Sequence, residues 1–144
     1  MLKTILAASV ASFLSAPFAI AETFEVQMLN RGAEGTMVFE PAFIAATTGD
    51  TINFIATDPG HNVETIEGML PAGAEPMLSE LGEDFSVTLT VEGLYGVKCT
   101  PHFPMGMVAM IQVGAPVNLE EVNAVTLRGK AKTRFELLLV QVVQ

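Results

Sequence analysis

Apolar and polar residues alternate along several short stretches of the chain. The pattern is clearest over residues 24–28 and 85–90, where every second residue is apolar. A period of two is typical of a strand with one buried face. Glycine, proline and asparagine separate these stretches and indicate turns, the first of them over residues 30–32 and 34–35. Further apolar strands are predicted over residues 37–39, 51–56, 94–98 and 107–113. Short strands at this spacing predict an all-β fold, an antiparallel sandwich or barrel.

Two segments depart from the strand pattern. Residues 68–84 are rich in proline and glycine, and we expect a loop there with one short helical turn at most. After residue 114 the pattern turns helical: Asn118 can cap a helix, and residues 130–140 can form a second one. We therefore predict a helical tail over residues 117–143. The apolar residues expected to pack it onto the sandwich are Val125, Leu127, Phe135, Leu138 and Leu139.

The first 21 residues have the organisation of a secretory signal peptide. Lys3 is followed by an apolar stretch over residues 5–18, and Ala19-Ile20-Ala21 matches the small-residue cleavage pattern. The apolar stretch is shorter than the roughly 20 residues of a membrane-spanning helix. We predict that residues 1–21 are removed, with a retained membrane anchor as the alternative. Residues 22–144 then form one exported domain, with the sandwich over about 22–114.

The charge of the predicted mature chain restricts its partners. Without Lys3 it has six basic residues against sixteen acidic ones, a formal charge of −10. Nucleic acids and anionic membranes would repel such a chain, so neither is expected as a partner. From the total charge, a protein partner is expected to present a basic or mainly apolar face.

The only cysteine and both histidines of the chain occur in a pattern that suits a metal. The segment 99–107, Cys-Thr-Pro-His-Phe-Pro-Met-Gly-Met, joins two predicted strands, and His61 lies on a separate turn upstream. Two imidazoles, a thiolate and a weak axial thioether are the ligands of electron-transfer copper sites. We predict one copper ion held by His61, Cys99, His102 and Met107. Four protein ligands leave no open position for a substrate, so an enzyme is not expected.

These residues also carry a family resemblance. From residue 26 to residue 114 the sequence resembles the pseudoazurin group of the cupredoxins. The matching motifs lie at residues 28–30, 32–35, 37–42, 60–64, 97–102 and 105–107. The resemblance implies a Greek-key cupredoxin sandwich of about eight strands, with two short C-terminal helices. It also implies one type 1 copper ion that cycles between Cu(I) and Cu(II), in a carrier that delivers electrons to periplasmic reductases, nitrite reductase above all.

Two methionines compete for the axial position. Met107 has the spacing from His102 found in plastocyanin and pseudoazurin, whereas Met105 has the shorter spacing of amicyanin. Pro104 departs from the usual pseudoazurin residue and makes the loop partly amicyanin-like. The Gly-Met that ends the loop and the match elsewhere favour Met107.

The resemblance further implies roles for residues around the copper. Asn62 would tie the two ligand loops together and donate its backbone N–H to the cysteine sulfur. Pro101 cannot add a second such bond because it has no N–H. Met37 would lie near the His102 ring, and Gly60 would point its carbonyl toward the metal.

The resemblance also implies how the protein meets its partners. A monomer is expected to dock redox proteins, such as a nitrite reductase or a c-type cytochrome, near His102, Phe103 and Met105. Pseudoazurins usually surround this patch with lysines, whereas the predicted mature chain has only three, Lys98, Lys130 and Lys132. That departure suggests a less acidic partner or docking through apolar contact.

Three other functions can be set against electron transfer. A periplasmic copper carrier that delivers metal is the main alternative, since the chain has eight methionines. A thiol hydrolase would need a free, reactive Cys99 thiolate beside His102. A copper oxidase would need further histidine clusters for oxygen chemistry, and two histidines are too few.

Overall fold

The computed structural model describes residues 20–144, which form two four-stranded sheets packed face to face. The first sheet has the order β2-β1-β4-β6 and the second has the order β3-β8-β7-β5. The strands are β1 (Thr23–Gly32), β2 (Gly35–Glu40), β3 (Phe43–Ala46), β4 (Thr51–Ile55), β5 (Glu64–Thr65), β6 (Phe85–Thr88), β7 (Gly93–Lys98) and β8 (Val108–Val113). The predicted all-β class and the expected number of strands are both confirmed. The predicted signal peptide lies outside the described residues, except for Ile20 and Ala21.

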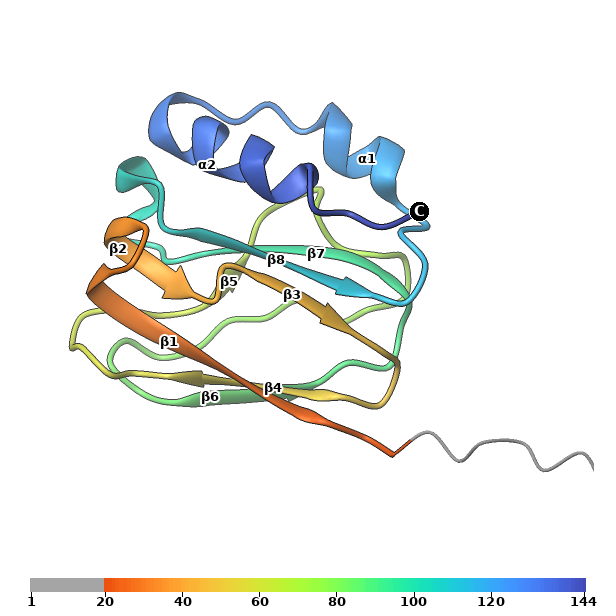
Figure 1. Ribbon diagram of the computed structural model, residues 1–144, viewed down its shortest axis with the longest axis horizontal. Coiled ribbons are helices and arrows are strands. Elements are labelled where there is room, and N and C mark those ends of the chain that lie inside the picture. The colour runs from red at the N-terminus through yellow and green to blue at the C-terminus, as the bar shows by residue number, and fades with distance from the viewer. Residues whose placement is uncertain (1–19) are drawn as a thin grey trace, which may run out of the picture.

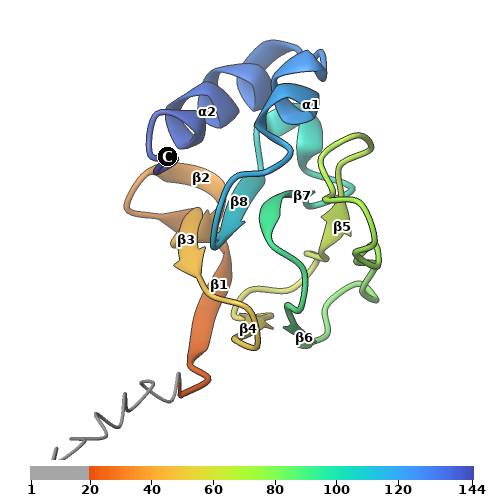
Figure 2. The same cartoon turned by 90° about the vertical axis from the view of Figure 1, so that its right-hand side faces the viewer.

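The strand pairing is mixed, which corrects the expectation of an antiparallel sandwich. β1 pairs with β4 in parallel, with Val26 opposite Phe54, and β3 pairs with β8 in parallel, with Ile44 opposite Ile111. The other pairings are antiparallel. Both parallel pairs arise because the chain crosses from one sheet to the other between the paired strands, as Figures 1 and 2 show. A residue pattern records which face of a strand is buried but not the direction of its neighbour.

The structure differs from the sequence pattern at two places near the first strands. A turn was expected over residues 30–32 and 34–35, but β1 continues to Gly32 and the turn is confined to Ala33 and Glu34. The strand β3 was not predicted. It is four residues long and consists largely of alanine and isoleucine, so it gives little alternation of apolar and polar residues.

The core lies between the two sheets and includes the segments that carry the copper motif. Phe39 and Phe54 pack edge to face with ring centroids 5.8 Å apart. Cys99 and Met107 are fully buried members of the same cluster. Two of the four candidate metal ligands are therefore anchored in the packed core, which limits their movement.

Two helices, α1 (Leu119–Ala124) and α2 (Gly129–Leu139), cover the outer face of the sheet that contains β7 and β8 (Figure 1). The predicted tail contacts are confirmed: Phe135 and Leu138 are buried, and Val125, Leu127 and Leu139 pack around them. Asn118 precedes α1 as expected, but its side chain does not cap the helix. It bonds instead to the backbone N–H and carbonyl of Leu94 in β7, at 2.7 and 2.9 Å, and so fastens the tail to the sheet.

Residues 68–84 form a loop, as the proline and glycine content predicted, with one isolated bridge at Leu78. Within residues 20–144, no helix has the length and apolar character needed to cross a membrane.

Candidate metal centre

The four predicted ligands lie on loops at the ends of strands. His61 lies between β4 and β5, directly after Gly60, whose φ of 87° favours glycine. Cys99 follows β7 immediately. His102 and Met107 lie on either side of the short 3₁₀-helix η1 (Phe103–Met105) that leads into β8. The fold therefore brings an upstream loop and a downstream loop together, although 38 residues separate His61 from Cys99.

Three of the four side chains direct donor atoms at one point. The Nδ1 atoms of His61 and His102 are 3.1 Å apart, and the Cys99 Sγ lies 3.7 and 3.4 Å from them, respectively. Nitrogen and sulfur atoms that bind one first-row metal ion at about 2.0–2.3 Å lie about 3–4 Å from each other. The spacing and the soft thiolate in the set both fit a single copper ion.

A hydrogen bond fixes the orientation of the first histidine. The Nε2 of His61 lies 3.0 Å from Oδ1 of Asn30, which can only accept. The proton is therefore on Nε2, and the Nδ1 lone pair is free for a metal. Burial lowers the pKa of the fully buried His61, and this also favours the neutral form that ligates. Sequence reasoning missed this role of Asn30, which it had assigned only to a turn and a family motif.

The Cys99 sulfur is buried, but backbone N–H groups hydrogen-bond to it. Burial raises the pKa of the Cys99 thiol, whereas hydrogen bonds from the backbone N–H groups of Asn62 and His102 act in the opposite direction. The Asn62 bond is the one that the resemblance implied. Because the pKa is raised overall, the thiol keeps its proton at neutral pH in the metal-free protein, and copper would displace that proton when it binds the thiolate.

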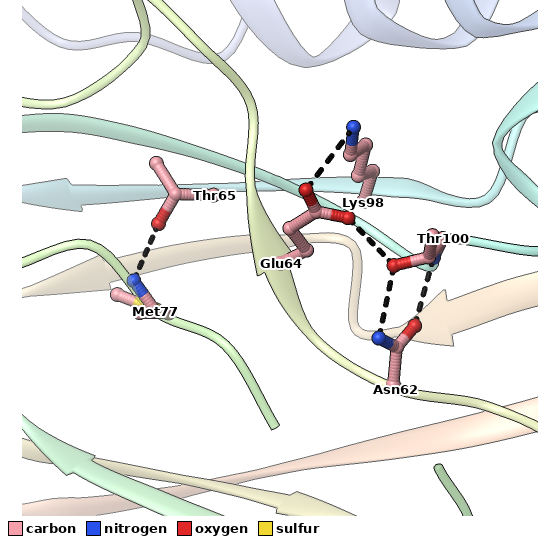
Figure 3. Close-up of polar contacts among 6 residues, drawn as sticks. All are labelled: Asn62, Glu64, Thr65, Met77, Lys98 and Thr100. Atoms are coloured by element: carbon pink, nitrogen blue, oxygen red, sulfur yellow. Dashed lines mark hydrogen bonds and ion pairs between the residues drawn. The ribbon is translucent and has the colours of Figure 1, made fainter. Parts of the chain in front are cut away.

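The side chain of Asn62 joins the two ligand loops, as expected. Its Oδ1 accepts the Thr100 backbone N–H at 2.8 Å, and its Nδ2 donates to the Thr100 hydroxyl at 2.9 Å (Figure 3). That hydroxyl donates in turn to Glu64 at 2.6 Å, and the other oxygen of Glu64 lies 3.5 Å from the Lys98 ammonium. The Lys98 ammonium is 5.1 Å from the centre of the Phe103 ring. A continuous polar chain thus runs from the cysteine loop to the surface beside Phe103.

The two competing methionines differ in burial. Met107 is fully buried in the cluster that contains Cys99, whereas Met105 is 42 % exposed. The Met107 carbonyl accepts the Cys99 N–H at 3.0 Å, and the Met107 N–H donates to the His102 carbonyl at 3.2 Å. These bonds hold the Met107 backbone beside both downstream ligands. Both methionine N–H groups donate to the His102 carbonyl, so it is the burial of Met107 and its bond to Cys99 that favour Met107 over Met105 as the axial ligand.

Comparisons with known proteins agree with this geometry. Residues 26–114 match the family model described as copper binding proteins, plastocyanin/azurin family. The chain is 51 % identical to the pseudoazurin of Paracoccus pantotrophus, with 95 % of this chain and 96 % of that protein aligned. It is 44 % identical to the pseudoazurin of Methylorubrum extorquens, over 86 % of this chain and 84 % of that protein.

Solved structures extend the similarity to the fold. The pseudoazurin of Hyphomicrobium denitrificans superimposes with a TM-score of 0.81 at 39 % identity, over 85 % of this chain and 99 % of that one. The pseudoazurin of Methylobacterium extorquens AM1 also gives a TM-score of 0.81, at 43 % identity, over 83 % of this chain and 98 % of that one. The predicted cupredoxin fold and copper cofactor are confirmed, as is the prediction that the chain is not an enzyme, because pseudoazurins are electron carriers. The chain belongs to the plastocyanin/azurin family of copper-binding proteins and, within that family, to the pseudoazurins.

Proposed function

We propose that residues 22–144, after removal of the signal peptide 1–21, form a monomeric periplasmic carrier of single electrons. In this proposal His61, Cys99, His102 and Met107 hold its copper ion. One observation carries the assignment: donor atoms of the only cysteine and both histidines of the chain lie within 4.8 Å of one another.

The chain contributes a fixed set of ligands to electron transfer. When bound, copper supplies the one-electron change between Cu(I) and Cu(II). The ligand loop is held by its own hydrogen bonds, including His102 N–H to the Cys99 carbonyl at 3.2 Å. Pro101 and Pro104 restrict the backbone further. A site that moves little between oxidation states needs little reorganisation, which favours fast transfer.

The burial of the donors argues against copper delivery, the main alternative. His61, Cys99 and Met107 are each 0 % exposed. A delivery protein must pass its metal to a receiver by exchange of ligands, which requires donor atoms that the receiver can approach. Here only His102, which is partly exposed, reaches toward the surface.

The visible and EPR spectra of the purified protein with added copper(II) test the proposal. We expect an intense visible band from the copper–thiolate bond, a type 1 EPR signal, one copper per chain, and a Cys99 thiol that no longer reacts with alkylating reagents. A colourless protein with a thiol that still titrates in copper(II) would contradict the copper assignment. Ready loss of the metal to a chelator would favour delivery instead.

The proposed docking face surrounds the second histidine. Pro104 and Met105 are exposed, and Phe103 and His102 are partly exposed. Basic residues flank this short apolar patch. Lys98 lies over Phe103, Arg128 lines a hollow with Phe103 and Pro104, and the Lys130 side chain packs beside Gly106.

This distribution changes the expectation drawn from total charge. Three of the six basic residues of the chain 22–144 lie at the rim of the patch, so basic side chains are concentrated there although the whole chain is acidic. A partner with an acidic rim around an apolar centre fits this face. The proposed partners are a nitrite reductase, as the resemblance implies, or a c-type cytochrome.

Phe103→Glu tests the docking face. The new charge lies in the apolar patch, so we expect slower electron exchange with a copper nitrite reductase and an unchanged visible spectrum. Val117→Glu is the matched control, because Val117 is 65 % exposed and follows β8 at its other end. Equal rates for the two variants and the original protein would exclude this face. With an acidic partner, rates that increase as salt is lowered would show that the basic rim, and not the acidic chain as a whole, governs the attraction.

A further inference from the structure

Arg134 of α2 contacts three carbonyl groups in two segments distant from it in sequence. Its Nη1 donates to the Met37 carbonyl at 2.7 Å and to the Gly106 carbonyl at 3.0 Å, and its Nη2 donates to the Thr36 carbonyl at 2.9 Å. The guanidinium is partly buried, and neither ion pair found within residues 20–144 involves it. Its hydrogen bonds are therefore directed at backbone carbonyl groups. Because the N–H donors of a guanidinium lie in one plane, they fix the positions of these carbonyls relative to one another.

One of these bonds acts on the peptide unit of the proposed axial ligand. The Gly106 carbonyl and the Met107 N–H belong to the same planar peptide group. Arg134 holds the carbonyl side of that group, and the His102 carbonyl accepts the N–H on the other side at 3.2 Å. The orientation of the Met107 backbone is thus fixed from both sides.

The other two bonds act on Met37. This residue has a φ of 52°, a left-handed conformation that is unfavourable for a side chain of its type. Arg134 holds the carbonyl before Met37 and the carbonyl of Met37 itself. Both peptide units around the strained residue are therefore fixed by one side chain.

The contact between α2 and the ligand loop is close as well as polar. Gly106 has a φ of 86°, and a Cβ added there would lie 3.0 Å from Cδ of Arg134 and 3.1 Å from the Lys130 carbonyl carbon. Only glycine suits both the backbone conformation and this approach. The helix therefore packs directly against the segment that leads into Met107.

From these contacts we infer that Arg134 is a positioning residue of the copper site: it sets the backbone of Met107, the proposed axial ligand, and of Met37. The inference rests on the proposed ligand set. It makes α2 a part of the metal centre, although the helix supplies no ligand and lies outside the segment matched by the family model.

Arg134→Lys tests the inference, because lysine keeps the charge and most of the stem but cannot hold three carbonyls in one plane. We expect the variant to fold and bind one copper, with a changed ratio of visible bands and altered EPR parameters. Loss of copper to a chelator should become about 10-fold faster, the usual scale for residues that support ligands. In the metal-free protein, the methyl NMR signals of Met37 and Met107 should shift. Lys132→Met is the control, since Lys132 lies on the same helix and pairs only with Glu136 at 3.7 Å.

The outcomes separate the proposed copper function from the positioning role of Arg134. If the original protein gives no type 1 spectrum, the proposed function fails, while the methyl shifts still report on the role of Arg134. If the original protein is blue and Arg134→Lys matches it in spectrum, chelator rate and methyl shifts, the positioning role is wrong. Loss of folding in Arg134→Lys would also overturn the inference, because it would assign Arg134 to global stability.

Discussion

Replacing Cys99 by serine is expected to abolish the type 1 copper spectrum. The intense visible band requires charge transfer from a thiolate to copper(II), and a hydroxyl is a hard, weakly acidic donor that cannot replace it. Loss of a residue that supports a ligand already lowers metal affinity about 10–100-fold, so loss of the thiolate itself should cost more than about 100-fold. Titration of the metal-free variant with copper(II), followed by absorbance and EPR, measures both effects.

Serine is the right substitution because it keeps the local hydrogen bonds. The backbone N–H groups of Asn62 and His102 that face the sulfur can donate equally to a serine oxygen. The metal-free variant should therefore fold, and a cost of about 1 kcal/mol would lower its Tm by only about 4 °C. An intense visible band that persists in this variant would show that Cys99 is not a ligand.

The proposed ligands could be selected from the sequence because most of them are neighbours. Cys99, His102 and Met107 occupy one loop, and their residue types have few other uses in combination. His61 could be added because it is the only other histidine. Strands with regular alternation, such as residues 24–28, could also be predicted from the sequence, because the alternation of apolar and polar residues directly reflects burial.

Two of the supporting residues, Asn30 and Arg134, could not be predicted, because their contacts are long-range and no family motif marked these roles. Asn30 and His61 are 31 positions apart, and Arg134 is 97 positions from Met37. The sequence around Asn30 and around Arg134 contains no pattern that indicates a role in a metal site. Asn118 shows the same limit: its position before α1 predicted a cap, but the nearby β7 backbone offered its side chain better partners.

Total charge says little about the proposed docking face for a related reason. The count of sixteen acidic residues is independent of fold, whereas the potential at Phe103 depends on which charges lie within about 10 Å, the distance over which salt screens them. Lys98 and Lys130 are far apart in sequence but both flank the same ligand loop. Only the folded chain shows that they act together.

Met107→Leu is expected to raise the reduction potential, whereas Met105→Leu should leave it unchanged. Loss of the axial thioether leaves three ligands, and copper(I) tolerates this lower coordination number better than copper(II), so the reduced state is favoured. A tenfold change in that equilibrium corresponds to about 59 mV for a one-electron couple, and we expect a shift of at least this order. Leucine is close to methionine in volume, so the buried site should stay packed, at a cost below about 1.5 kcal/mol.

The pair of variants decides between the two loop spacings because the residues differ in environment. Met105 is 42 % exposed at the proposed docking face, so Met105→Leu should alter partner kinetics at most, with the band ratio and EPR signal of the original protein. Met107 is fully buried beside Cys99, so Met107→Leu should change both spectra while copper remains bound. The reverse result, with the spectra sensitive to Met105 and indifferent to Met107, would assign this loop the amicyanin arrangement.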